Sequence, residues 1–203
     1  MRYLDIKIRG KSFLLYEDGV YLGFLFPSQI KDIVSEKDFS PETGLKVSDE
    51  EVEALKDKII DGTFEKGVSY LAETERCGED LRLKLLQKRY PEYAISEAID
   101  KLYEFNYLND ERFMESFIRS YMNQKSRSLI MRELSMRHIS LQDFDEVYDR
   151  ISEEEDVDED KAIEKLLKRF EGQDMSDERV RRRAAALLVR HGFSFDRINN
   201  HLT

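Results

Sequence analysis

The sequence predicts a mainly α-helical protein, in which three tandem three-helix (helix-turn-helix-like) repeats form an elongated array after a small β-rich extension. Three observations predict this fold. Two apolar runs flank an Asp-Gly pair near the N-terminus, which is typical of a β-hairpin. After about residue 48 no strand pattern follows. The remaining sequence instead repeats one apolar spacing, with intervals of five, five and four residues.

Residues 1–47 are predicted to form the β-rich unit. Leu4, Ile6 and Ile8 alternate with polar residues, so we expect them on one face of a strand. The hairpin turn is predicted at Asp18-Gly19. Ser48 followed by Glu51 forms a capping box, which begins a linking helix over residues 48–62 and places a separable unit before it.

The repeated spacing predicts three helical repeats, over residues 63–109, 110–152 and 153–203. It occurs at Leu85, Tyr90, Ile95 and Ile99; at Leu134, Ile139, Phe144 and Tyr148; and at Leu188, Phe193, Ile198 and Leu202. A break of five residues followed by a new helical phase describes a helix, a tight turn and a second helix. A further helix is predicted before each pair, and the third of these, "AIEKLLKRF", is separated from its pair by a loop of different length. Because one such repeat buries little apolar surface, neighbouring repeats should stack.

The composition and charge of the chain limit the classes of protein to which it can belong. The 203 residues carry a formal net charge of -10, with 40% hydrophobic and 37% charged residues. No apolar run reaches the roughly 18 residues that span a bilayer, and the start has no secretory h-region. The single cysteine, Cys77, allows no internal disulfide. We therefore expect a cytoplasmic, monomeric protein without membrane contact, whose acidic charge disfavours tight autonomous DNA binding.

Two segments on this periodicity resemble the RecX family of recombination regulators. They are "NYLNDERF" (Asn106 to Phe113), at the junction of the first two repeats, and "RHGFSFDRI" (Arg190 to Ile198), at the turn of the third. The resemblance covers roughly residues 64–203, and the β-rich start is similar to the extension that some members carry. The two segments occur in the family's order, which makes them more specific together than either alone.

The sequence departs from the family pattern at three turn positions. Family members often have glycine where this chain has Asn106, the non-glycine residue that best tolerates left-handed backbone geometry. They also often have glycine before the apolar turn residue of each repeat. Here only Gly192 keeps it, while Arg89 and His138 replace it in the first two repeats. We therefore expect strain or a different cap at those two turns.

The resemblance implies the function. RecX proteins bind RecA, the ATP-dependent recombinase that polymerises on single-stranded DNA, lie along the filament groove, and limit its ATPase, strand exchange and coprotease activities. It therefore implies a negative regulator of homologous recombination, DNA repair and the SOS response. The expected partner is the RecA filament, with single-stranded DNA bound weakly or only within the filament.

No motif in the sequence indicates an enzyme. The GxxxxGK[ST] phosphate loop, HExxH and GxSxG are absent, and the three histidines lack metal-site spacing, so no catalytic, cofactor or metal residue is predicted. Cys77 could be an activated thiol at a helix N-terminus, but a cap position usually held by serine is favoured. The stripe of Phe113, Phe117 and Tyr121 is interpreted as core rather than as a base-stacking platform.

The segment "RVRRRAAALLVRHGF" (residues 179–193) carries the candidate partner-binding residues. On a helical wheel Val180, Ala184, Leu187, Leu188 and His191 face inward. The predicted partner-binding residues are Arg179 and Arg182, which point outward, and Arg183 and Arg190, which flank one edge. Arginine is enriched at protein interfaces.

Two alternatives stay open at this level. Residues 152–160 are acidic except for Ser152 and Val157, and they are interpreted as a solvated linker with acids near the next helix N-terminus. They could instead pair with the arginines of residues 179–190 and merely balance charge. A protein of another class, a stand-alone helix-turn-helix DNA-binding regulator, would also expose arginines, although the net charge disfavours it.

Overall fold

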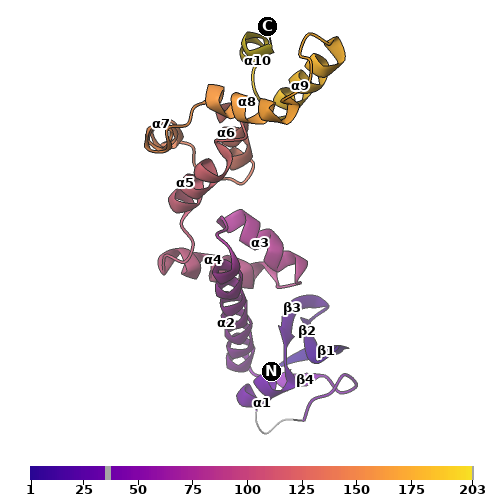
Figure 1. Ribbon diagram of the computed structural model, residues 1–203. Coiled ribbons are helices and arrows are strands. Elements are labelled where there is room, and N and C mark those ends of the chain that lie inside the picture. The colour runs from indigo at the N-terminus through magenta and orange to yellow at the C-terminus, as the bar shows by residue number, and fades with distance from the viewer. Residues whose placement is uncertain (35–37, 203) are drawn as a thin grey trace. The chain divides into compact units, whose positions relative to one another are not determined.

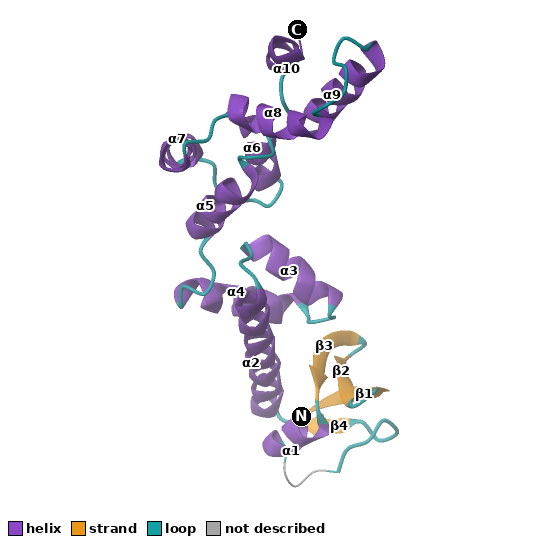
Figure 2. Cartoon of the chain, viewed as in Figure 1, coloured by secondary structure: helices purple, strands orange, loops and turns teal. Residues whose placement is uncertain are grey.

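The computed structural model describes residues 1–34 and 38–202, and the chain divides into two compact units, residues 1–109 and 110–203 (Figure 1). Among the described residues, the first unit contains a four-stranded sheet and four helices, and the second contains only helices (Figure 2). The predicted mainly α fold with a small N-terminal β part is confirmed. Among the described residues, no helix is long and apolar enough to cross a membrane.

The sheet is antiparallel throughout, with the order β3-β2-β1-β4. Its strands are β1 (Arg2–Arg9), β2 (Ser12–Glu17), β3 (Val20–Leu25) and β4 (Leu45–Val47). The predicted hairpin joins β2 to β3, and both Asp18 (φ 48°) and Gly19 (φ 80°) have positive φ, as a two-residue hairpin turn of type I′ requires. Leu4, Ile6 and Ile8 alternate along β1 as predicted; Leu4 and Ile6 are buried, but Ile8 is 61% exposed because the core ends before the tip of β1. The short helix α1 (Pro27–Ile33) was not predicted.

The inner face of the sheet packs on α2 (Asp49–Glu73). The predicted capping box is present: the Ser48 hydroxyl accepts from the Glu51 amide at 3.2 Å, and Glu51 accepts from the Ser48 amide at 2.6 Å. One core cluster joins the two layers; it includes Leu4, Ile6, Leu15, Leu22 and Leu25 from the strands and Val52, Leu55 and Ile59 from α2. Figure 1 shows the strands beside the N-terminal half of this helix.

Each predicted repeat contains three helices. The first consists of the C-terminal part of α2, α3 (Gly78–Gln87) and α4 (Glu92–Glu104). The second consists of α5 (Asp110–Tyr121), α6 (Arg127–Ser135) and α7 (Phe144–Glu155). The third consists of α8 (Glu159–Leu167), α9 (Glu178–Arg190) and α10 (Phe195–Leu202), and α8 continues into the 3-10 turn η1 (Lys168–Phe170). The residues of the repeated spacing are buried or partly buried in their own repeats. The structural units meet at residues 109 and 110, whereas the finer division at residues 47, 62 and 152 stays a prediction.

The five-residue interval is the signature of a Schellman turn. The Leu85 carbonyl accepts from the Tyr90 amide, Leu134 from Ile139, and Leu188 from Phe193, each at 3.2 Å. The residue before the last member has left-handed backbone geometry in each turn: Arg89 (φ 66°), His138 (φ 59°) and Gly192 (φ 85°). Arg89 and His138 thus take the conformation that glycine adopts without strain. Asn106 (φ 57°) also takes it, as predicted.

Candidate partner-binding surface

Helix α9 is positioned by a cap at its start and an apolar face along its length. The Asp177 carboxylate accepts from the Arg179 amide at 2.8 Å, which satisfies one backbone donor of the first turn. Ala184, Leu187 and Leu188 are buried, and the last two join the core of the third repeat. The four predicted residues, Arg179, Arg182, Arg183 and Arg190, are all exposed, as is Arg181. The structure therefore presents the predicted arginines to solvent.

These arginines make few contacts within the chain. Arg182 pairs with Glu178 one turn away at 2.5 Å, and its side chain is 77% exposed. Arg183 lies over the Phe170 ring at 5.7 Å, and the Arg190 Nε donates to the Ala186 carbonyl at 3.4 Å. The Arg179 side chain has no ion pair with any residue that the structure describes. Most of the guanidinium hydrogen-bonding capacity on this helix is thus left for another molecule.

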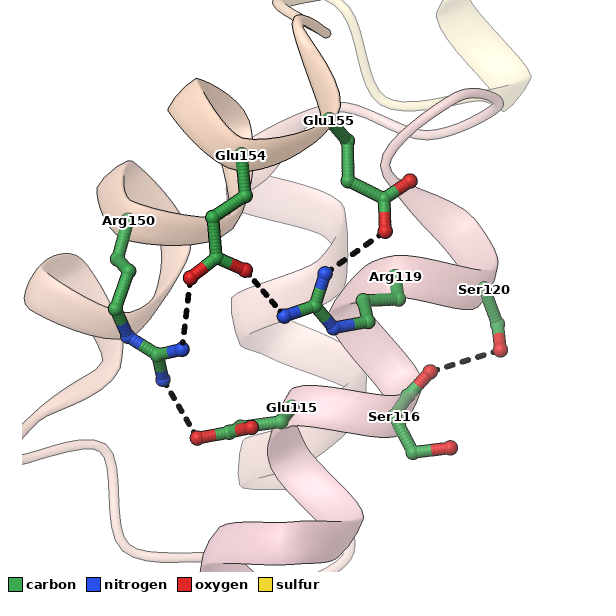
Figure 3. A network of polar contacts seen from close by, with 7 residues as sticks. All are labelled: Glu115, Ser116, Arg119, Ser120, Arg150, Glu154 and Glu155. Atoms are coloured by element: carbon green, nitrogen blue, oxygen red, sulfur yellow. Dashed lines mark hydrogen bonds and ion pairs between the residues drawn. The ribbon is translucent and has the colours of Figure 1, made fainter.

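The acidic segment before the third repeat pairs with other cations. Arg119 on α5 reaches Glu154 at 2.5 Å and Glu155 at 2.8 Å, and Arg150 bridges Glu115 at 2.6 Å and Glu154 at 3.4 Å (Figure 3). The hydrogen bond from Arg119 holds the pKa of Glu154 below its usual value, and the same contact raises the pKa of Arg119. These pairs fasten α7 to α5 within the second repeat.

A second charged cluster joins the second repeat to the third. Arg127 contacts Asp145 at 2.8 Å and Asp149 at 2.6 Å, while the Arg127 amide donates to Glu159 at 2.8 Å. Arg197 on α10 pairs with Glu159 at 2.9 Å and with Asp160 at 2.7 Å. His201 and Arg197, which donate to Asp160, lower its pKa.

The structure therefore does not bring the acids of residues 152–160 to the predicted arginines. It also shortens the linker, because α7 continues to Glu155 and α8 begins at Glu159. Asp158 caps α8 by accepting from the Lys161 amide at 2.8 Å, so acids do lie at this helix N-terminus. The predicted solvated linker is confined to residues 156–158, and the ion pairs of the acidic segment are made with cations outside α9.

The turn after α9 is fastened to the second repeat. The His191 carbonyl accepts from the Ser126 amide at 2.9 Å, and His191 Nδ1 contacts the Gln124 carbonyl. A Cβ on Gly192 would lie 2.5 Å from the Leu129 Cβ and 2.6 Å from the Ser126 hydroxyl. Only glycine therefore fits this contact. The same contact fixes the orientation of α9, and with it the arginines, on the second unit.

A shallow groove between α9 and α10 adds a residue that the sequence analysis did not select. The groove has a volume of about 420 Å³ and is lined by Glu178, Arg181, Arg182, Ala185, Asn199 and Leu202. Arg181 was not selected because α10, which forms the other wall of the groove, has no position on a helical wheel of α9. The exposed basic surface thus extends to both edges of the helix.

The remaining candidates take structural positions. Cys77 is buried at the N-cap of α3, the position that Ser126 and Asp177 occupy in the later repeats. Phe113 and Phe117 are buried as predicted and contact each other at 5.8 Å between ring centroids. The described residues contain no group of three His, Cys, Asp or Glu side chains placed to hold a metal ion.

Comparison with known proteins places these features in a family. A family model described as RecX, second three-helix domain, matches residues 109–147. A regulatory protein RecX from Bacillus velezensis is 34% identical over 67% of this chain and 52% of its own length, and one from Pseudomonas entomophila is 33% identical over 66% and 84%. The chain spans about half the length of the Bacillus relatives that it matches. A crystal structure of a regulatory protein RecX has the same fold, with a TM-score of 0.57 and 18% identity over 98% of this chain and 97% of that one.

Proposed function

The chain belongs to the RecX family of regulatory proteins, and from that premise we propose that it regulates the RecA recombinase by binding the RecA filament on single-stranded DNA. Family membership is the observation that carries the proposal. On this proposal the protein limits the ATPase, strand-exchange and coprotease activities of RecA without catalysing a reaction itself. It would act as a cytoplasmic monomer and restrain recombination, DNA repair and the SOS response.

The exposed arginines of α9 are the proposed contact surface. Arg179, Arg182, Arg183 and Arg190 carry positive charge on a protein whose net charge is -10, so this surface contrasts with the rest of the chain. Exposed Ala186 and Val189 lie between them and let another surface approach the helix. Arginine can form paired hydrogen bonds with carboxylates and phosphates, and buried arginine anchors are common among the residues that dominate binding energy.

The direct experiment measures RecA ATPase on single-stranded DNA with increasing amounts of the protein. We expect inhibition at or below one protein per RecA subunit. The double variant Arg179→Glu/Arg182→Glu should weaken inhibition at least tenfold with little change in thermal midpoint, because both side chains are exposed. Lys165→Glu/Lys168→Glu is the matched control: it reverses two exposed charges at the same spacing in the same repeat.

Three results would contradict parts of the proposal. An unchanged ATPase rate with excess wild-type protein at low salt contradicts regulation of RecA. Wild-type inhibition by the arginine variant, or an equal loss in the lysine control, contradicts the assignment to α9. Sub-micromolar, sequence-selective duplex binding without RecA would favour the stand-alone DNA-binding regulator instead.

A further inference from the structure

The outer face of the sheet carries an aromatic and basic surface for which the family resemblance gives no role. Side chains opposite one another in an antiparallel pair share a face. The register pairs Lys7 with Leu14 and Leu14 with Phe24, and it pairs Tyr16 with Tyr21. The rings of Tyr16 and Tyr21 are 5.4 Å apart, and the Lys7 ammonium lies 4.6 Å from the Tyr16 ring. This face lies opposite the one that packs on α2.

The turn between α3 and α4 closes one side of this face and forms a pocket. The pocket has a volume of about 350 Å³ and is lined by Leu14, Tyr16, Tyr21, Arg89, Tyr90, Pro91 and Glu92. The Tyr21 hydroxyl donates to the Arg89 carbonyl at 3.0 Å, and the Tyr90 ring contacts the Phe24 ring at a tilt of 49°, with 5.0 Å between the centroids. Both contacts hold the turn against the sheet. We call the pocket together with Lys7 and Arg9 the tyrosine face.

Arg89 is held in this pocket at a conformational disadvantage. Its φ of 66° belongs to the left-handed region, where the corresponding residue of the third repeat is Gly192. Gly192 is required by its close neighbours, whereas Arg89 is exposed and forms no ion pair with a described residue. Strained residues that a fold retains without a structural contact are candidates for function.

The charges around the pocket favour an anion. Burial, and then the neighbouring Tyr16, raise the pKa of Tyr21, while the positive charges of Arg9 and Arg89 oppose this shift. Glu92 is the acid on the pocket wall, and Arg82 pairs with it at 2.5 Å. Asp5 is the remaining acid on the outer face of β1, opposite Tyr16. Lys7, Arg9 and Arg89 therefore leave the tyrosine face with a net positive charge.

We propose that the tyrosine face binds single-stranded nucleic acid, with a base stacked against Tyr16 and Tyr21 and the neighbouring phosphates held by Arg89, Lys7 and Arg9. Aromatic side chains beside a basic groove are the features that bind single strands without sequence preference. The surface is wider than the pocket, so it accommodates a strand rather than one nucleotide. A duplex keeps its bases stacked inside and offers none to these rings. The site is separate from α9 and does not depend on the action of the protein on RecA.

The test measures binding of the full-length protein to a fluorescently labelled 15-nucleotide oligothymidylate by anisotropy at 50 mM salt, without RecA. Arg89→Gly removes the guanidinium and relieves the backbone strain, so affinity should fall at least fivefold while thermal stability is kept or raised. His138→Gly is the matched control, because His138 is the corresponding residue of the second repeat and has the same backbone geometry. Tyr16→Ala should also weaken binding at least fivefold, and duplex of the same length should bind more weakly than the single strand.

Several outcomes would overturn this assignment. One is wild-type affinity of both Arg89→Gly and Tyr16→Ala, particularly if Arg179→Glu/Arg182→Glu abolishes binding. Another is an equal loss of affinity in His138→Gly. Thymidine monophosphate is a further competitor. If it displaces the labelled strand as well as unlabelled strand does, at equal total nucleotide concentration, the site binds mononucleotides. Equally effective competition by polyglutamate would indicate an acidic-peptide site.

Discussion

The two units of this protein complete the same three-helix repeat by different means. In the first unit the sheet covers α2, and the contact is an apolar core that contains Leu15, Leu22 and Leu55. In the second unit the two repeats brace each other through Glu159, which accepts from the Arg127 amide and pairs with Arg197, and through the turn at Gly192. A small three-helix repeat can therefore be supported by buried apolar side chains, or by ion pairs and a close backbone contact. The first kind of support should be sensitive to cavities, and the second to pH and to added side-chain volume.

The largest effect should come from a cavity in the first unit. Leu55 is fully buried between α2 and the sheet, so Leu55→Ala removes apolar contacts and leaves a void. We expect a loss of about 2–5 kcal/mol in the free energy of unfolding, measured by urea denaturation. The loss should be the same at 50 mM and 500 mM salt, because no charge is involved. A strongly salt-dependent loss would contradict the apolar description of this unit.

A comparable but smaller loss is expected in the second unit from Gly192→Ala. The new methyl group meets Leu129 and Ser126, and the residue keeps a left-handed φ. Backbone strain and overpacking together should cost about 2–4 kcal/mol. Gly172→Ala is the control, since its φ is 80° but nothing lies within 4 Å of an added Cβ. Equal losses in the two variants, measured by hydrogen exchange in residues 110–203, would show that the close fit contributes nothing.

Acid should weaken the second unit before the first. Arg119 lowers the folded-state pKa of Glu154, and His201 and Arg197 lower that of Asp160, so their stabilisation is present above the unfolded pKa and lost as pH falls through the folded value. Glu42 and Glu53 of the first unit also have lowered pKa values, but they bond to neighbours within three residues. Hydrogen exchange between pH 6 and 3 should show earlier loss of protection in residues 110–203.

The acid prediction has its own control. Glu154→Gln, which cannot titrate at that position, should reduce the difference between the two units as pH falls. Simultaneous loss of protection in both units, with or without this substitution, would mean that the interhelical carboxylates do not set the acid response.

The smallest effect should be a gain. His138 is exposed and left-handed, so His138→Gly relieves strain without removing a buried contact. We expect stability to rise by up to about 1 kcal/mol, less the backbone entropy that glycine adds to the unfolded chain. A shift of the urea midpoint at constant slope would measure it. A loss of stability would show that the His138 side chain supports the turn.

Local signals predicted most of the fold. The Asp18-Gly19 turn, the Ser48 cap and the five-residue intervals are each set by residues close together in the chain, and each appears where the sequence indicates it. The alternation of Leu4, Ile6 and Ile8 predicted their shared face but not that Ile8 stays exposed, because how far a core extends along a strand depends on the layer that covers it. Helix α1 was missed, since its seven residues make less than two turns, which is too short for an apolar periodicity to be recognised.

The surfaces were predictable only in part. The helical wheel placed Arg179 and Arg182 outward correctly, because α9 buries a single face. The wheel could not show that Arg119 pairs with Glu155 or that Arg127 pairs with Asp145. In the sequence these partners are 36 and 18 residues apart. The tyrosine face was missed for the same reason: Tyr21 and Arg89 are 68 residues apart and meet only in the folded unit.

The bond between Ser126 and His191 also sets an order of events during synthesis. The amide that begins α6 finds its acceptor 65 residues later, in the last turn of the third repeat. A ribosome makes the chain from its N-terminus, so the first unit can reach its final form while residues 110–203 are still being added. The second repeat cannot make this bond until His191 has emerged. Chains that stop before Gly192 should therefore have a complete first unit and an unfinished second one.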